Sequence, residues 1–301
     1  MNSTLSRLLK VTLLIAILGL SGCTVEKPAS TLNQKLVLTS ISPLADLIKQ
    51  VGGDKVQVVN LVPPGTDPHD FEPKPEAVRQ VANAKLFIEN GVGQEYYLEK
   101  LIKNAGNPTL HTVTLSEGLP ILGQESGSLG NPHLWLDVQN AQVYVEKIRD
   151  ALIKTYPEDK VTFEKNAQAY LGELKVLDQW IKDQILNLPD ESRKIVVFHD
   201  AWSYYANRYG LTVLTPVVHS GQSEPSAKEY AEILQLIRQN KVKAVFGEVG
   251  FNPKLIHQLA SDSGAKVVDD LYDDTLGNTA ETDSYIKVMK YNTNALVSAL
   301  K

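Results

Sequence analysis

The sequence predicts an α/β protein of two lobes, each with a mainly parallel sheet, joined by a long rigid helix. Short β-rich runs alternate with helical stretches from Lys35 onward, and again after residue 193. Such alternation is typical of βαβ units. Between the two series, residues 157–189 carry proline at each end and apolar residues at helical spacing. At 1.5 Å per residue, about 30 residues of helix extend about 45 Å, so we expect a strut between a lobe at 35–156 and a lobe at 190–301.

The helices and strands of each series are predicted from their composition and from the proline, glycine and capping residues at their ends. The first series predicts strands at 35–42, 55–62, 85–90 and 109–115, with helices at 43–53, 75–84 and 94–105. The second predicts strands at 194–200, 211–218, 242–249 and 265–272, with helices at 201–210, 226–240, 253–264 and 282–300. Pro75 suits the first turn of its helix, and Ser226 with Glu229 forms a capping-box pattern.

The composition is that of an ordinary globular protein. Of 301 residues, 43% are hydrophobic and 22% are charged, which leaves room for two modest domains. The formal net charge is −5, and the chain has no strongly basic stripe. We therefore expect no nucleic-acid partner.

The N-terminus predicts an exported lipoprotein. Arg7 and Lys10 precede the apolar run "VTLLIAILGL" and then "LSGC", which ends at Cys23. This is the pattern of a signal peptide over residues 1–22, and the apolar run is about half of the roughly 20 residues that span a bilayer. "LSGC" resembles a lipobox, and Cys23 is the single cysteine of the chain. We expect lipid on Cys23 to anchor the protein through a flexible tether, residues 23–34.

Two histidines follow a proline in loops. His69 lies in "TDPHDFEP" and His133 in "GNPHLWLDV". Each proline fixes its own φ and biases the preceding residue toward extended backbone. A stiff loop holds an imidazole in place at low entropic cost, which matters for a metal ligand and little for a solvated surface histidine.

Other polar residues follow predicted strands. His199 comes after "KIVVF", and both Asp273 and Asp274 come after "KVVDDLY". Ligands of open α/β sheets bind beyond the carboxyl ends of the strands, so these side chains could meet His69 and His133 in a cleft between the lobes. The remaining histidines are less favoured as metal ligands. We expect His111 to lie in a sheet and His257 on a solvated helix face, while His219 could line the cleft.

The sequence lacks the familiar enzyme motifs. It contains no H-E-x-x-H, no G-x-S-x-G and no P-loop pattern. Three histidines and one carboxylate complete a tetrahedral set, whereas catalytic zinc keeps one position for water. The pattern therefore favours a binding protein over an exported zinc hydrolase or a surface adhesin, the two alternatives from other classes.

Several motifs in a fixed order carry a family resemblance. "PHDFEP", "NPHLWLDVQNAQVYVEKI", "VVFHDAWSYYANRYGL", "SEPSAKEYAEI" and "VVDDLYDDTLGNTAETDSYIKVMKYN" resemble the metal-binding lipoproteins of bacterial zinc and manganese ABC importers. The resemblance covers essentially all of the chain from Lys35. It implies two α/β lobes bridged by a rigid helix, a metal held between them, and delivery of that metal to an ABC permease. It also implies a monomer held at the outer face of the cytoplasmic membrane or in the periplasm.

The resemblance also implies a ligand set and a cargo. The family's ligands fall on His69, His133, His199 and Asp273. Histidine at the third position resembles the zinc-linked members, and imidazole suits zinc, so zinc is the expected cargo and manganese the alternative. The short segment "SEGLPILGQESGSLGNPH" lacks the histidine-rich loop of many zinc members.

Ligand imidazoles need partners for their other ring N–H. By position in the sequence alone, the candidates for this role are Asp137, Asp200 and Glu248.

Overall fold

The computed structural model describes residues 35–124, 128–218 and 224–301. The expected signal peptide, Cys23 and tether lie outside these residues, as does His219. Residues 35–301 form one compact unit. In the part of the chain that is described, no helix has the length and apolar character needed to cross a membrane.

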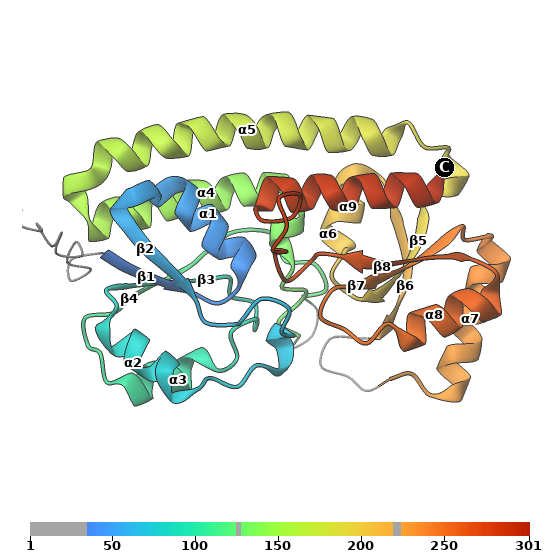
Figure 1. The fold of residues 1–301 in the computed structure, drawn as a ribbon, viewed down its shortest axis with the longest axis horizontal. Helices are drawn as coiled ribbons and strands as arrows, with labels where there is room; N and C mark the ends of the chain where they lie inside the picture. The colour runs from blue at the N-terminus through green and yellow to red at the C-terminus, as the bar shows by residue number, and fades with distance from the viewer. Residues whose placement is uncertain (1–34, 125–127, 219–223) are drawn as a thin grey trace, which may run out of the picture. The chain divides into compact units, whose positions relative to one another are not determined.

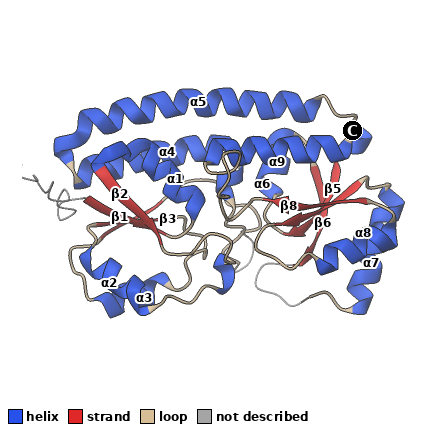
Figure 2. Cartoon of the chain, in the orientation of Figure 1, coloured by secondary structure: helices blue, strands red, loops and turns tan. Residues whose placement is uncertain are grey.

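The first lobe is built on four parallel strands in the order β2-β1-β3-β4 (Figure 1). The strands are β1 (Lys35–Thr39), β2 (Val56–Asn60), β3 (Leu86–Glu89) and β4 (His111–Thr114). The helices are α1 (Ser42–Gly52), α2 (Pro75–Asn83), α3 (Leu98–Ala105) and α4 (Val138–Thr155). Figure 2 shows α1 and α4 on one face of this sheet and α2 and α3 on the other. Because both faces are covered, Val37 and Leu38 on the central strand β1 are both fully buried.

The second lobe repeats this plan with the strand order β6-β5-β7-β8, again parallel. The strands are β5 (Lys194–His199), β6 (Thr212–Val218), β7 (Ala244–Glu248) and β8 (Lys266–Leu271). The helices are α6 (Ser203–Tyr209), α7 (Ala227–Asn240), α8 (Lys254–Ser263) and α9 (Tyr285–Leu300). Ser226 and Glu229 form the predicted capping box at the start of α7. Pro216 lies in the edge strand β6, where a missing N–H is tolerated.

Helix α5 (Lys160–Leu186) has 27 residues and contacts both lobes. It packs against α1 and α4 of the first lobe and against α6 and α9 of the second (Figure 1). Its buried stripe belongs to one hydrophobic cluster that also includes Val37 of β1 and Ile195 of β5. The predicted long helix that joins the two lobes is confirmed, and it also packs along its length into a core that the two lobes share.

The loops that carry the candidate ligands follow directly from this plan. Strand β2 leads into the 3-10 turn η3 (Pro68–Asp70), and β5 ends on His199. His133 precedes the 3-10 turn η4 (Leu134–Leu136), and β8 ends two residues before Asp273. Three of these four segments therefore follow the carboxyl ends of parallel strands, where ligands of such sheets bind.

Candidate metal centre

His69 is presented by a short loop with little backbone freedom. It lies in η3 after Pro68, whose ring fixes φ. The side chain of Asp67 accepts the backbone N–H of His69 at 2.8 Å, which caps the turn. The His69 side chain is 12% exposed, so the imidazole lies at the rim of the buried cluster.

His133 and His199 are the inner members of the cluster. His133 is fully buried, and His199 is 1% exposed at the end of β5. Their Nε2 atoms lie 3.2 Å apart. The ring of His69 is 5.3 Å from that of His133 and 5.7 Å from that of His199, measured between centroids. The three imidazoles therefore converge from two loops of the first lobe and one strand of the second.

The carboxylate that faces these imidazoles belongs to Asp274. Its Oδ2 is 3.4 Å from Nε2 of His69 and 3.7 Å from Nε2 of His199. Its Oδ1 is 3.4 Å from Nε2 of His133. Asp273, the residue that the resemblance selected, does not join this group of atoms. Its Oδ2 lies instead 3.3 Å from Nδ1 of His199, on the far side of that ring.

Several polar atoms in the cluster are buried and have no hydrogen bond within the described protein. They are Nε2 of His69, both carboxylate oxygens of Asp274 and Oδ2 of the neighbouring Asp273. Buried polar atoms are otherwise paired almost throughout folded proteins, so unpaired ones that point at one another need an explanation. One donor atom from each of His69, His133, His199 and Asp274 falls in a group spanning at most 4.8 Å. Three nitrogens and one oxygen at this spacing form a donor set for a divalent metal.

Glu248 contacts the back of the His199 ring. Its Oε2 is hydrogen-bonded to Nδ1 of His199, and its Oε1 accepts the indole N–H of Trp202 at 2.9 Å. Glu248 is itself only 3% exposed. With Nδ1 bonded to a carboxylate, the ring turns Nε2 toward the cluster, as ligand histidines commonly do.

The other two carboxylates considered for this role have different partners. Asp137 caps α4 by accepting the backbone N–H of Gln139 at 2.8 Å, and it lies 3.6 Å from Nε of Arg208. The side chain of Asp200 accepts the hydroxyl of Ser203 at 2.9 Å, in the turn that begins α6. Neither of these contacts involves an imidazole: Asp137 caps α4, and Asp200 lies in the turn before α6.

The charges in the cluster follow from its burial and its pairings. Burial lowers the pKa of His133 well below its usual value, so this ring is neutral and its nitrogen lone pair is available. Burial alone would lower the pKa of His199, but the carboxylates of Glu248 and Asp273 raise it well above its usual value. Burial alone would raise the pKa of Asp274, but the three imidazoles hold it below its ordinary value, so this carboxylate is ionised.

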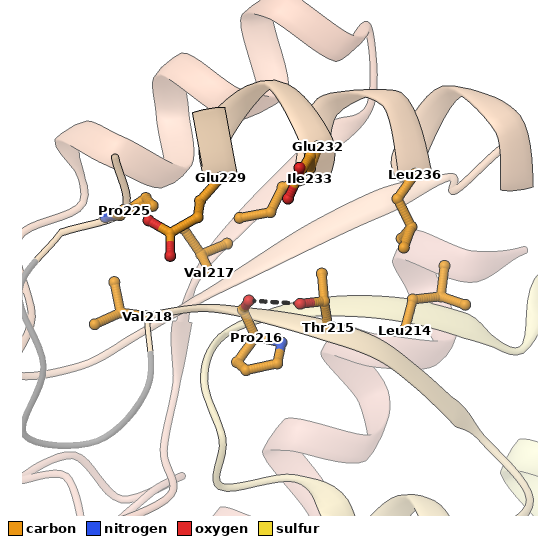
Figure 3. Close-up of a pocket in the computed structure, with 10 residues that line it drawn as sticks. All are labelled: Leu214, Thr215, Pro216, Val217, Val218, Pro225, Glu229, Glu232, Ile233 and Leu236. Atoms are coloured by element: carbon orange, nitrogen blue, oxygen red, sulfur yellow. Dashed lines mark hydrogen bonds between the residues drawn. The ribbon is translucent and has the colours of Figure 1, made fainter. Parts of the chain in front are cut away.

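The remaining described histidines lie elsewhere. His111 on β4 is 3.3 Å from the Lys154 ammonium, and His257 pairs with Asp269 on the surface. A separate hollow of about 310 Å³ lies between β6 and α7, lined by apolar side chains and by Glu229 and Glu232 (Figure 3). No residue of the histidine cluster lines it.

Comparison with known proteins identifies the family. The model of the ZnuA family, described as zinc-uptake complex component A, periplasmic, matches residues 37–299. The chain belongs to this family. It is therefore a substrate-binding component of a metal ABC transporter and not an enzyme, and the expected location outside the cytoplasm is confirmed.

Individual relatives cover nearly the whole chain. The manganese-binding lipoprotein MntA of Halalkalibacterium halodurans is 31% identical over 294 residues, covering 96% of this chain and 97% of that protein. The manganese ABC transporter substrate-binding lipoprotein PsaA of Streptococcus pneumoniae is 30% identical over 299 residues, with 96% of each covered. The solved periplasmic zinc binding protein TroA from Treponema pallidum has a TM-score of 0.83 and 28% identity, covering 89% of this chain and 99% of that one. The expected two-lobed α/β fold is thereby confirmed.

Proposed function

We propose that this protein captures zinc outside the cytoplasm and delivers it to an ABC-type permease. The proposed ligands are His69, His133, His199 and Asp274. The observation that carries the proposal is the ionised carboxylate of Asp274, which is buried without a hydrogen bond and faces Nε2 of the three imidazoles. Desolvating a carboxylate in this way is costly unless a cation compensates it.

Zinc is supported by the donor chemistry. Three imidazole nitrogens and one carboxylate oxygen make a complete four-coordinate set of the kind that zinc prefers, whereas manganese favours oxygen-rich sites. A set completed by the protein leaves no position for a reactive water, which agrees with binding instead of catalysis. Manganese is the second candidate, because MntA and PsaA carry manganese in their names.

Delivery follows from the family and from the N-terminal sequence. We propose that the mature protein is a monomer tethered by lipid on Cys23, which keeps it near its permease and raises their encounter rate. The proposed units are a lobe at 35–156, the bridging helix at 157–189 and a lobe at 190–301. Because the hydrophobic core is continuous between the lobes, we propose that metal entry and release need small local movements and not a wide hinge opening.

Competitive metal titration tests this proposal. Metal-free protein lacking residues 1–23 would be titrated with zinc and with manganese by calorimetry, beside His199→Glu and the control His257→Glu, whose histidine lies on the surface. We expect zinc to bind far more tightly than manganese, and His199→Glu alone to weaken zinc. Equal or tighter manganese binding would overturn the choice of cargo. Failure to bind either metal would overturn the ligand set.

A further inference from the structure

Asn131 contacts the ring of His133 and the backbone of the residue that follows His199. Its Oδ1 accepts the backbone N–H of His133 at 3.0 Å and lies 2.9 Å from Nδ1 of the same ring. Its Nδ2 donates to the backbone carbonyl of Asp200 at 2.6 Å. Asp200 directly follows His199 in the sequence. One half-buried amide therefore links the loop of His133 in the first lobe to the end of β5 in the second.

The orientation of this amide is fixed by its partners. A backbone N–H can only donate and a backbone carbonyl can only accept, so a flipped amide would place NH₂ against N–H and oxygen against oxygen. Oδ1 therefore faces Nδ1 of His133 and can only accept there. In a neutral ring the proton must then lie on Nδ1, which leaves the lone pair of Nε2 directed at the cluster.

A second contact joins the same two segments. The hydroxyl of Tyr204 on α6 donates to the carbonyl of Asn131 at 2.9 Å and accepts the backbone N–H of Leu122 at 2.9 Å. The loop before His133 is thus bonded to the second lobe at the side chain and at the backbone of Asn131. In the same structure, the Nε2 atoms of His133 and His199 lie 3.2 Å apart.

We propose that Asn131 is a positioning residue that fixes the Nδ1–H tautomer of His133 and holds His133 against His199 as a preformed pair of ligands. This inference rests on the proposed metal capture. The Asn131 amide would orient the His133 ring through Nδ1, as the Glu248 carboxylate does for the His199 ring. A preformed pair lowers the ordering cost of binding the ion.

Nitrogen NMR of the metal-free protein tests the tautomer directly. Long-range ¹H–¹⁵N spectra distinguish Nδ1–H from Nε2–H imidazoles, and loss of one ring signal in His133→Gln assigns His133. We expect His133 to carry its proton on Nδ1 in the wild type and on Nε2 in Asn131→Ala, where the carboxylate of Asp274 lies 3.4 Å from Nε2. Asn131→Asp keeps an oxygen at Nδ1 and should keep the Nδ1 proton. An Nε2 proton in the wild type would overturn the inference.

Zinc affinity gives the second readout. Loss of the hydrogen-bond partner of a ligand histidine typically costs about 10- to 100-fold in metal affinity. We expect a loss of that size for Asn131→Ala, and its thermal midpoint would show whether the variant is folded. The matched control is Asn140→Ala, since Asn140 also bonds a backbone carbonyl, that of Leu134, but touches no imidazole. Equal affinities of the two variants would overturn the positioning role. If the wild type bound no metal, the proposed function would fail while the tautomer result still stood.

Discussion

Oδ1 of Asp274 lies 3.4 Å from Nε2 of His133, although one residue follows the last strand of the second lobe and the other lies in a loop of the first. The indole N–H of Trp135, two residues after His133, donates to the carbonyl of Asp273 at 2.8 Å. The hydroxyl of Tyr285 in turn donates to the carbonyl of Trp135 at 2.6 Å. The two ligand segments are therefore held against each other by buried hydrogen bonds that do not involve the ligand atoms themselves.

Substitution of the two neighbouring aspartates separates their roles. We expect Asp274→Asn to lower zinc affinity by more than about 100-fold, because it removes a charged donor from the cluster, and outer partners alone are worth about 10- to 100-fold. Asp273→Asn should cost less, since its carboxylate lies 3.3 Å from Nδ1 of His199 and not among the Nε2 atoms. Calorimetric titration of both variants measures this, and a larger loss in Asp273→Asn would return the ligand role to Asp273.

Glu248 offers a second test of the site. Both of its carboxylate oxygens accept hydrogen bonds, one from His199 and one from the indole N–H of Trp202. Glu248→Gln retains one acceptor oxygen and places an NH₂ against a donor, so we expect zinc affinity to fall by about 10- to 100-fold. Glu232→Gln on the exposed face of α7 is the control and should bind as the wild type does. An unchanged affinity in Glu248→Gln would show that a neutral amide at Nδ1 of His199 serves as well as the carboxylate.

The alternation of strands and helices could be predicted because it depends on residues that are close together in the sequence. The capping box of Ser226 and Glu229 and the glycine that ends α6 are short-range signals of this kind. The shared core was not predictable in the same way. The stripe of α5 that includes Phe163 and Ile185 is equally consistent with a strut, and only the packing partners show that it joins both lobes.

The sequence predicts those residues of the candidate site that lie at the carboxyl ends of strands. His69 lies in the loop after β2 and His199 ends β5, so both lie at carboxyl ends of parallel strands. Asp137 illustrates the limit, because a carboxylate just before a helix serves equally well as its cap. Asp273 and Asp274 lie in a turn after β8, where side chains no longer alternate between two faces, so the sequence could not decide which of them faces the imidazoles.

Glu95 predicts a pH dependence of stability. Its carboxylate is buried and accepts the Ser40 hydroxyl at 2.6 Å and the backbone N–H groups of Asn90 and Gly91. Burial raises its pKa from 4.5 to about 7. The folded protein then binds the proton more tightly than the unfolded chain, so stability falls as pH rises from about 4.5 to about 7 and is constant beyond that window.

Comparison with Glu95→Gln isolates this contribution, because glutamine does not titrate. We expect the free energy of unfolding of the wild type, relative to that of Glu95→Gln, to fall by roughly 3 kcal/mol between pH 4.5 and pH 7. Urea unfolding at a series of pH values measures the difference. A difference that stays flat across this window would mean that Glu95 is ionised in the folded protein at its ordinary pKa.

Gly172 is an exposed glycine in the middle of α5, and a Cβ added there would meet no atom within 4 Å. Alanine is favoured over glycine in a helix interior by about 1 kcal/mol, so we expect Gly172→Ala to raise the thermal midpoint by about 2 to 4 °C. The control is Gly106, which also has open space for a Cβ but has a φ of +60° after α3. Gly106→Ala should destabilise by about 1 to 2 kcal/mol, because only its backbone conformation opposes a side chain. If Gly172→Ala lowered the midpoint, the glycine would have a role in α5 that its open surroundings do not reveal.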